Sequence, residues 1–242
     1  MRLVKLDAID STNDYLKGLS NSQPVENFTV VTAENQTKGK GQMGAVWNSE
    51  IGKNLIMSVL VKNVLSDISL IYHLNVAVAL AVIEALQKQN IPDLSIKWPN
   101  DIMAGNKKIG GILIENSIKP DGEIHSIVGL GLNVNQKNFE NLPKAFSLAL
   151  VAERDFDKEM LLLEIIDRMK TNIGQLMENP DLLWQAYTGH LFKKGIPMPF
   201  ENQDGKQFMG IIEGVEPDGK LRILLEDDTF ATFGLKEIQM LY

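Results

Sequence analysis

Residues 94–115, LSIKWPNDIMAGNKKIGGILIE, carry the strongest topological signal in the chain. The apolar strand pattern at their start ends at Pro99–Asn100, because proline cannot donate a hydrogen bond to a sheet ladder. The segment Ala104–Gly105–Asn106 is typical of a tight turn between residues 101–103 and a strand over 108–114. Strands joined by such a turn run antiparallel. The stretch therefore predicts a sheet that is antiparallel or mixed.

Short apolar runs rich in β-branched residues predict more strands around this hairpin. Asp121–Gly122 marks a second hairpin. The segment 69–89 is apolar on nearly every face, which indicates a buried helix. Because strands and helices do not alternate strictly, the pattern favours an α+β fold, with a mixed sheet backed by helices. The predicted strands are 28–32, 54–61, 94–98, 108–114 and 125–134, and the predicted helices are 12–19, 69–89, 158–177 and 180–190.

The residue pattern changes from long apolar and helical segments to short alternating ones after Lys194. Short alternating segments follow, separated by Asp204–Gly205 and Asp218–Gly219. This pattern is typical of a small β-barrel of about 50 residues. We therefore expect two domains, residues 1–192 and residues 193–242.

Composition excludes several classes of protein. The 242 residues contain no cysteine, which excludes disulfides, thiolate zinc sites and a cysteine nucleophile. A net charge of −7 argues against a general nucleic-acid binder. The least polar stretch, residues 68–83, is too short for a membrane span, and no signal peptide is recognisable. We expect a cytoplasmic protein without a membrane partner.

Three segments are candidates for chemistry. The loop 36–44, QTKGKGQMG, brings three glycines and two lysines together and could wrap phosphate or carboxylate oxygens; a solvated polar turn is the alternative. Residues 97–101, KWPND, end a strand, and Lys108 then precedes two glycines, although an ordinary hairpin would look similar. Residues 129–133, GLGLN, are weaker, since strand glycines often mark a bulge or tight packing. The three histidines have no metal-ligand spacing, so no fixed metal site is expected.

In this order, these motifs resemble those of biotin protein ligases. The matching segments are Ser11-Thr-Asn13, Gln36 with the Gly39–Gly44 loop and Trp47, Lys97–Asp101, Lys108–Ile112 and Gly129–Asn133. The resemblance covers nearly the whole chain and implies a short form that lacks an N-terminal DNA-binding domain, so no DNA partner is expected. It also implies an SH3-like form for the C-terminal barrel.

The resemblance implies a reaction in two steps. Biotin and Mg-ATP form biotinyl-5′-AMP and pyrophosphate, and a lysine of a biotin carboxyl carrier domain then takes the biotinyl group. The catalytic residues would be Lys108, Lys97 and Asp101. The biotin site would comprise Ser11, Thr12, Asn13, Gln36, Lys40, Gly41, Gln42, Lys108, Gly110 and Gly111. The ATP site would comprise Gly39, Lys40, Trp47, Asn100, Gly129, Gly131 and Asn133, with Mg²⁺ entering with ATP.

One departure and several alternatives accompany this interpretation. Family members usually read Gly-Arg-Gly-Arg in the loop, whereas this chain reads Gly39-Lys-Gly-Gln42, which loses the bidentate guanidinium groups. A lipoate–protein ligase shares the fold and the adenylate chemistry, and a non-catalytic biotin- or carrier-binding module would share the site. An octanoyl transferase would need a cysteine. An exposed sheet edge leaves room for a homodimer.

Overall fold

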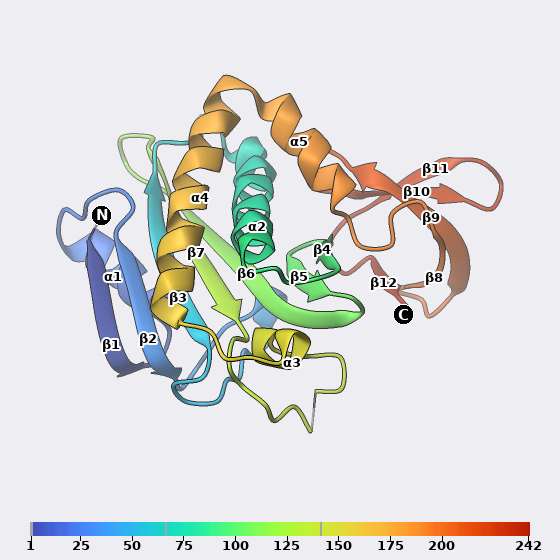
Figure 1. Cartoon of the computed structure of the whole chain (residues 1–242). Coiled ribbons are helices and arrows are strands. Elements are labelled where there is room, and N and C mark those ends of the chain that lie inside the picture. The colour runs from blue at the N-terminus through green and yellow to red at the C-terminus, as the bar shows by residue number, and fades with distance from the viewer. Residues whose placement is uncertain (1, 66, 141) are drawn as a thin grey trace.

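The computed structural model describes residues 2–65, 67–140 and 142–242 and contains two β-sheets (Figure 1). The larger sheet has seven strands in the order β1-β2-β3-β7-β6-β5-β4. Only β1 and β2 pair in parallel, and the remaining ladders of this sheet are antiparallel, so the predicted mixed sheet is confirmed. Its strands are β1 (Leu3–Ile9), β2 (Val30–Gln36), β3 (Leu55–Lys62), β4 (Leu94–Lys97), β5 (Asp101–Ala104), β6 (Lys107–Ile118) and β7 (Ile124–Leu132).

The two predicted hairpins lie side by side at one end of the larger sheet. Gly105, with φ of +56°, turns the chain from β5 into β6 in the left-handed region that glycine tolerates. Gly122, with φ of +89°, lies in the turn from β6 into β7. Lys97 at the end of β4 is paired directly with Asp101 at the start of β5. The KWPND segment is therefore the connection between the edge strand β4 and its neighbour β5.

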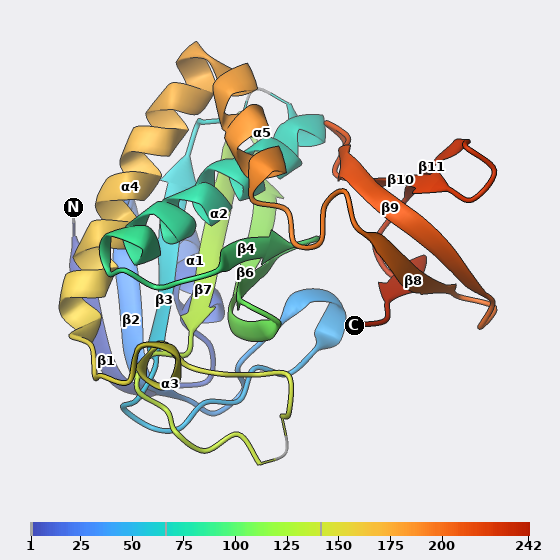
Figure 2. The ribbon, with the colours of Figure 1, turned by 45° about the vertical axis from the view of Figure 1, so that its right-hand side comes forward.

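Helices cover both faces of the larger sheet. The long helices α2 and α4 lie over one face, where α2 is almost wholly buried between the sheet and α4, as its apolar sequence predicts (Figures 1 and 2). Helix α1 packs on the opposite face through Leu16, against Val31, Leu60 and Ile127. The helices are α1 (Thr12–Ser22), α2 (Ile71–Lys88), α3 (Leu148–Ala152), α4 (Lys158–Glu178) and α5 (Pro180–Gly189), with 3₁₀ turns η1 (Gln42–Gly44) and η2 (Ile68–Leu70).

The second sheet contains five antiparallel strands in the order β11-β10-β9-β8-β12. Within the described residues no ladder joins β11 to β12, so the region predicted as a small barrel is an open five-stranded sheet. Closure requires the two edge strands to pair, and β12, three residues long, pairs only with β8. The small C-terminal β domain itself is confirmed. Its strands are β8 (Pro197–Asn202), β9 (Gln207–Val215), β10 (Leu221–Leu225), β11 (Phe230–Phe233) and β12 (Ile238–Met240).

The chain passes from one sheet to the other after α5. Phe192 still donates its backbone N–H to Ile96 of β4, whereas Gly195 donates to Ile212 of β9. The boundary at residues 192 and 193 stays a prediction, which these two bonds support.

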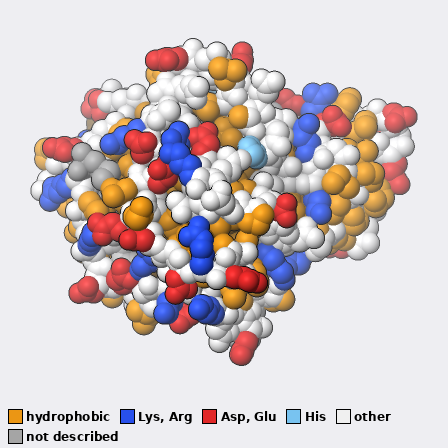
Figure 3. Space-filling model, viewed as in Figure 1, with side chains coloured by type: hydrophobic (Ala, Val, Ile, Leu, Met, Phe, Trp, Pro, Cys, Tyr) orange, Lys and Arg blue, Asp and Glu red, His pale blue; other side chains and the backbone are white. Residues whose placement is uncertain are grey.

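The distribution of charged and apolar side chains over the surface, and the character of the helices, agree with the acidic, moderately apolar composition. Acidic and basic side chains are interspersed over the larger sheet and its helices, while hydrophobic side chains gather over the C-terminal sheet at the right (Figure 3). Of the helices in the described ranges, none combines the length and apolar character that crossing a membrane would require.

Candidate active site

A cavity of about 580 Å³ lies where the two sheets meet. Fifteen of the predicted site residues line it: Ser11, Thr12, Asn13, Gln36, Lys40, Gly41, Gln42, Trp47, Lys97, Asn100, Asp101, Lys108, Gly111, Gly129 and Gly131. The C-terminal sheet adds lining residues that sequence reasoning did not assign, among them Phe200, Leu221 and Lys236. The structure therefore brings motifs from distant parts of the sequence into one chamber.

Three predicted site residues lie outside the cavity lining. Asn133 is buried and donates its side-chain amide to the Phe146 carbonyl at 3.0 Å, which ties the end of β7 to the segment before α3. Gly110 faces the Gly131 carbonyl and the Leu132 side chain. Gly39 lies against the Trp47 backbone, to which it is joined by a hydrogen bond. Each of the three has a packing reason that does not involve a ligand.

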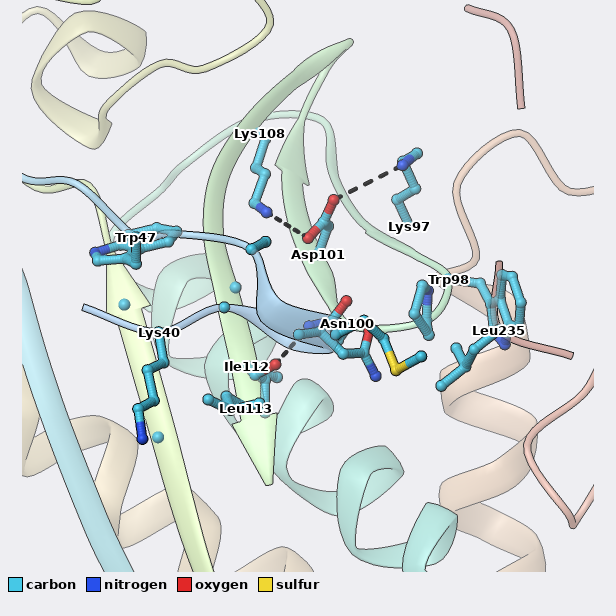
Figure 4. Close-up of a pocket in the computed structure, with 18 of the residues that line it drawn as sticks. Lys40, Trp47, Lys97, Trp98, Asn100, Asp101, Lys108, Ile112, Leu113 and Leu235 are labelled. Carbon is cyan, nitrogen blue, oxygen red and sulfur yellow. Dashed lines mark hydrogen bonds and ion pairs between the residues drawn. The ribbon is translucent and has the colours of Figure 1, made fainter. Parts of the chain in front are cut away.

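Lys97, Asp101 and Lys108 form a cluster in the cavity, here called the lysine–aspartate cluster (Figure 4). Lys108 Nζ lies 2.6 Å from Asp101 Oδ1, and Lys97 Nζ lies 3.7 Å from Asp101 Oδ2. All three side chains are largely buried, with exposed fractions of 34% for Lys108, 22% for Lys97 and 16% for Asp101. An unpaired ammonium in an apolar strand would be costly, and Asp101 gives the Lys97 ammonium a carboxylate partner.

Burial lowers the pKa of the Lys97 ammonium, and Asp101 opposes this effect while Lys108 and Lys144 reinforce it. Two ammonium groups around a single carboxylate leave the cluster with a surplus positive charge. A partly buried cluster with such a surplus attracts anionic groups and stabilises negative charge that develops during a reaction.

The peptide that carries Asp101 is held from several sides. Tyr72 Oη and Asn75 Nδ2, both on α2, donate to the Pro99 carbonyl at 3.2 and 3.1 Å. Trp98 Nε1 donates to the Gly219 carbonyl, in the turn between β9 and β10, at 2.8 Å. The position of Asp101 is thus fixed jointly by α2 and by the C-terminal sheet.

Polar side chains of α1 and β2 line one side of the cavity, namely Thr12, Asn13 and Gln36. They are hydrogen-bonded to Ser58 of β3 and Glu115 of β6, which do not line it. These five residues are here called the polar wall. Gln36 Oε1 accepts from the Thr12 backbone N–H at 2.8 Å, and Asn13 Nδ2 donates to Glu115 Oε2 at 2.8 Å. Ser58 Oγ donates to Asn13 Oδ1 at 2.6 Å. Ser11 caps α1, where its hydroxyl accepts from the Asp14 N–H.

Sequence reasoning missed Ser58 and Glu115. Ser58 is wholly buried and is the single polar residue among the seven from Leu55 to Val61 of β3, which is the signal that could have found it. Glu115 stands at the end of the strand pattern that follows Lys108, but its partner Asn13 lies 102 residues earlier in the chain. Only the sheet order brings the two together.

Residues 40–43 of the glycine-rich loop line the cavity, and Figure 2 shows this segment near the C-terminal end of the chain. Lys40 forms an ion pair with Asp14 at 2.7 Å, which raises the pKa of the Lys40 ammonium. Lys236 Nζ lies 3.4 Å from the Met43 carbonyl and so connects the loop to the C-terminal sheet. The predicted phosphate-binding lysine is therefore at the rim of the cavity, with an exposed carboxylate as its present partner.

Gly129 and Gly131 make room for two larger side chains in the cavity. A Cβ on Gly131 would lie 2.5 Å from Cε2 of Trp47, and a Cβ on Gly129 would lie 2.5 Å from Oδ1 of Asn13. The indole of Trp47 consequently lies close against Gly131 of β7, with Lys108 Nζ 5.8 Å from its ring centroid. Within the described part of the chain, its buried Nε1 has no hydrogen-bond partner. The glycine spacing thus has a steric cause, which is to admit Trp47 and Asn13.

The described residues hold no group of three or more His, Asp or Glu side chains that could bind a metal ion. The carboxylates that line the cavity are Asp101 and Glu201. Magnesium often keeps several waters and binds through one or two carboxylates together with substrate phosphates. The donor set therefore fits a magnesium ion that arrives with a nucleotide.

Comparisons with known proteins agree with this geometry. A family model described as the biotin/lipoate A/B protein ligase family matches residues 6–135. The bifunctional ligase/repressor BirA of Bacillus subtilis is 31% identical over 246 residues, which cover 98% of this chain and 71% of that protein. The biotin–[acetyl-CoA-carboxylase] ligase of Mycobacterium tuberculosis is 28% identical over 214 residues, covering 87% and 79% of the two chains. The biotin protein ligase of Aquifex aeolicus, solved with biotin and ATP, superposes with a TM-score of 0.81 at 26% identity, covering 99% and 98%.

Proposed function

From the fact that this chain belongs to the biotin/lipoate A/B protein ligase family, we infer that it is a biotin protein ligase that uses ATP to attach biotin to a lysine of a biotin carboxyl carrier domain. The observation that carries this inference is the lysine–aspartate cluster, set in the same cavity as the polar wall. One end of the cavity suits a charged reaction centre, and the other suits a neutral, hydrogen-bonding ring.

In the first step, a carboxylate oxygen of biotin attacks the α-phosphorus of ATP. An acyl–phosphate bond forms, the bond between the α- and β-phosphates breaks, and pyrophosphate leaves. Negative charge builds up on the α-phosphate oxygens as they pass through a crowded phosphorus centre. Lys108, with its ammonium in the cavity and only 34% exposed, is suited to stabilise that charge. Mg²⁺, bound to the ATP phosphates, would offset the charge of the leaving pyrophosphate.

In the second step, the amine of the carrier lysine attacks the acyl carbon, an amide bond forms and AMP leaves. The incoming amine must lose protons and must be oriented toward the carbonyl. Asp101 is suited to accept a hydrogen bond from this amine, since its carboxylate lines the cavity and its orientation is set by Lys108 and Lys97.

The polar wall supports biotin rather than lipoate as the acyl substrate. A ureido ring offers N–H donors and a carbonyl acceptor, which hydroxyl and amide side chains such as Thr12, Asn13 and Gln36 can satisfy. A dithiolane ring offers none of these groups. Each buried polar group left without a partner costs about 1–3 kcal/mol, so a hydrogen-bonding pocket discriminates strongly against an apolar analogue.

The test is incubation of the protein with Mg-ATP, biotin and a biotin carboxyl carrier domain, followed by intact-mass measurement. We expect one biotinyl group per carrier domain and release of AMP and pyrophosphate. Replacing biotin with lipoate should abolish the modification, and efficient lipoylation would reassign the substrate. Biotin binding without any pyrophosphate release would instead support a non-catalytic binding module.

Replacing Trp47 with alanine should weaken ATP binding more than biotin binding. We propose that its indole stacks on the adenine ring, and stacking of a base on an aromatic side chain contributes about 1–3 kcal/mol. The KM for ATP should therefore rise by about 5- to 160-fold, while the KM for biotin changes by less than about threefold.

Trp47→Phe serves as the control, because it keeps an aromatic face. Steady-state pyrophosphate release at varied ATP and varied biotin separates the two constants. A larger effect on the biotin constant would contradict adenine stacking.

A further inference from the structure

Tyr242, which follows β12, lies beside the lysine–aspartate cluster but does not line the cavity. Its ring centroid is 5.3 Å from Lys97 Nζ and 4.2 Å from Lys144 Nζ. Figure 2 shows the marked C-terminal end turned from β12 back toward the larger sheet. The ring of Tyr242 therefore makes cation–π contacts with two ammonium groups of the larger domain, those of Lys97 and Lys144.

The ring is itself fixed in place. It packs edge-on against Phe192, with ring centroids 5.1 Å apart and planes at 71°. Phe192 is buried and its backbone is bonded to Ile96 in β4, the strand that carries Lys97. The backbone N–H of Leu241 donates to the Pro199 carbonyl of β8 at 2.9 Å. Both the ring and the backbone beside it are thus anchored to defined elements.

Lys97 needs such a partner more than Lys108 does. Lys108 Nζ is 2.6 Å from Asp101 Oδ1, a close ion pair, whereas Lys97 Nζ is 3.7 Å from Asp101 Oδ2, a looser one. A lysine side chain has a flexible four-carbon stem, so a single loose ion pair holds it poorly. An aromatic face within about 6 Å provides a second attraction for its ammonium.

We propose that Tyr242 is a positioning residue for the transfer step, whose ring holds the Lys97 ammonium beside Asp101. The proposal rests on the ligase function inferred above. With Lys108 bound to Oδ1 and Lys97 held near Oδ2, the Asp101 carboxylate keeps one orientation toward the incoming amine. Without the ring, Lys97 turns away and Asp101 gains freedom to rotate. Because the ring face makes the contact, phenylalanine should replace tyrosine.

The test measures single-turnover transfer from preformed biotinyl-5′-AMP to the carrier domain, alongside biotin-dependent pyrophosphate release. We expect Tyr242→Leu to slow transfer at saturating carrier by about 5- to 30-fold, the range of a partly desolvated cation–π contact. The carrier concentration for half-maximal rate and the rate of pyrophosphate release should stay unchanged. Tyr242→Phe should restore transfer.

Phe230→Leu provides a matched control. Phe230 is an aromatic residue of the same sheet with an Arg222 guanidinium 4.2 Å from its ring, but it does not line the cavity. This variant should transfer biotin at the wild-type rate. In a Lys97→Met background, Tyr242→Leu should cause no further loss, because the ring then has no ammonium to position.

Several results would overturn the proposal. An equal loss in the Lys97→Met background would show that the ring acts on something other than Lys97. A raised half-saturating carrier concentration would show that it contacts the carrier. A lower Tm with equal losses in both steps would reduce it to a structural contact.

The ligase function is tested separately, since it fails if the wild-type protein forms no adenylate. The contact between ring and ammonium has its own readout, the ring-current shift of the Lys97 side-chain methylenes in NMR spectra. That shift should be present in the wild-type protein and in Tyr242→Phe, and lost in Tyr242→Leu. Its absence from the wild-type spectrum would refute the positioning role whatever the activity.

Discussion

Replacing Lys108 with alanine lowers the rate of biotin-dependent pyrophosphate release by an expected 10²- to 10³-fold, about the cost of removing one preorganised charge-stabilising donor. The reason lies in the cavity, where Lys108 Nζ is the ammonium closest to Asp101 and is mostly shielded from water. Shielding makes its interaction with developing phosphate charge stronger than it would be in solvent. No neighbouring side chain reproduces this position, because Lys97 reaches Asp101 from its other oxygen.

The control for Lys108 is its neighbour in the sequence. Lys107 is exposed, and its Nζ donates to the Pro143 carbonyl outside the cavity. Lys107→Ala should therefore form adenylate at the wild-type rate. The backbone of residue 108 is bonded through its N–H to Lys144 and through its carbonyl to Phe146, and alanine keeps both bonds. Pyrophosphate release near the wild-type rate in a folded Lys108→Ala protein would remove Lys108 from the reaction.

Much of the larger sheet could be predicted from sequence because its elements have strong local signals. The apolar helix α2, the amphipathic helix α4 and the turns at Gly105 and Asp121–Gly122 all lie where residue patterns placed them. β1 was missed, since it is an edge strand in which Lys5 and Asp7 interrupt the apolar pattern. Charged residues are expected on exposed edges, where they discourage further strand pairing.

The C-terminal sheet shows where local patterns stop being sufficient. β8 contains Pro197 and Pro199, and prolines argue against a strand when the sequence is read alone. β12 has only three residues and no strong pattern. Whether a sheet closes depends on how its two edges meet, which is set by packing over the whole domain rather than by any segment.

The residues of the candidate site likewise fall into those that local sequence patterns predict and those that they do not. Motif residues such as Lys97, Asp101 and Lys108 could be predicted because they are close in sequence and strongly patterned. Glu115 and Tyr242 could not, because their contacts join parts of the chain that are far apart, and Ser58 has only the weak signal of one polar residue in an apolar strand. Asn13 and Glu115 are separated by 102 residues, and Tyr242 meets Lys97 only because α5 carries the chain into the second sheet.

Replacing Asp101 with asparagine should separate the two chemical steps. Asparagine has nearly the same shape as aspartate, but it is uncharged and a much weaker proton acceptor. If Asp101 accepts a hydrogen bond from the carrier amine, transfer from preformed biotinyl-5′-AMP should slow by about 10²- to 10⁴-fold, the range for loss of a positioned acid–base group. Adenylate formation, which relies on Lys108, should fall far less.

The same variant makes a prediction for the pKa of Lys97. Asp101 is the group that raises this pKa, while burial, Lys108 and Lys144 lower it. Removing the carboxylate leaves only the lowering contributions, so the pKa of Lys97 in Asp101→Asn should fall below its wild-type value. Titration of the Lys97 side chain by NMR measures this change directly, and an unchanged or higher pKa would contradict the assigned pairing.

Asp10→Asn is the matched control for Asp101→Asn. Asp10 pairs with Lys38 at 2.7 Å, but the pair is exposed and Asp10 is outside the cavity lining. An exposed ion pair contributes little, so this variant should leave both steps at the wild-type rates. If Asp101→Asn slows pyrophosphate release as much as transfer, Asp101 acts on the adenylate rather than on the amine. The loss of pyrophosphate release would then be explained by the ion pair between Asp101 and Lys108, whose groups are 2.6 Å apart, because removing the carboxylate would also displace Lys108.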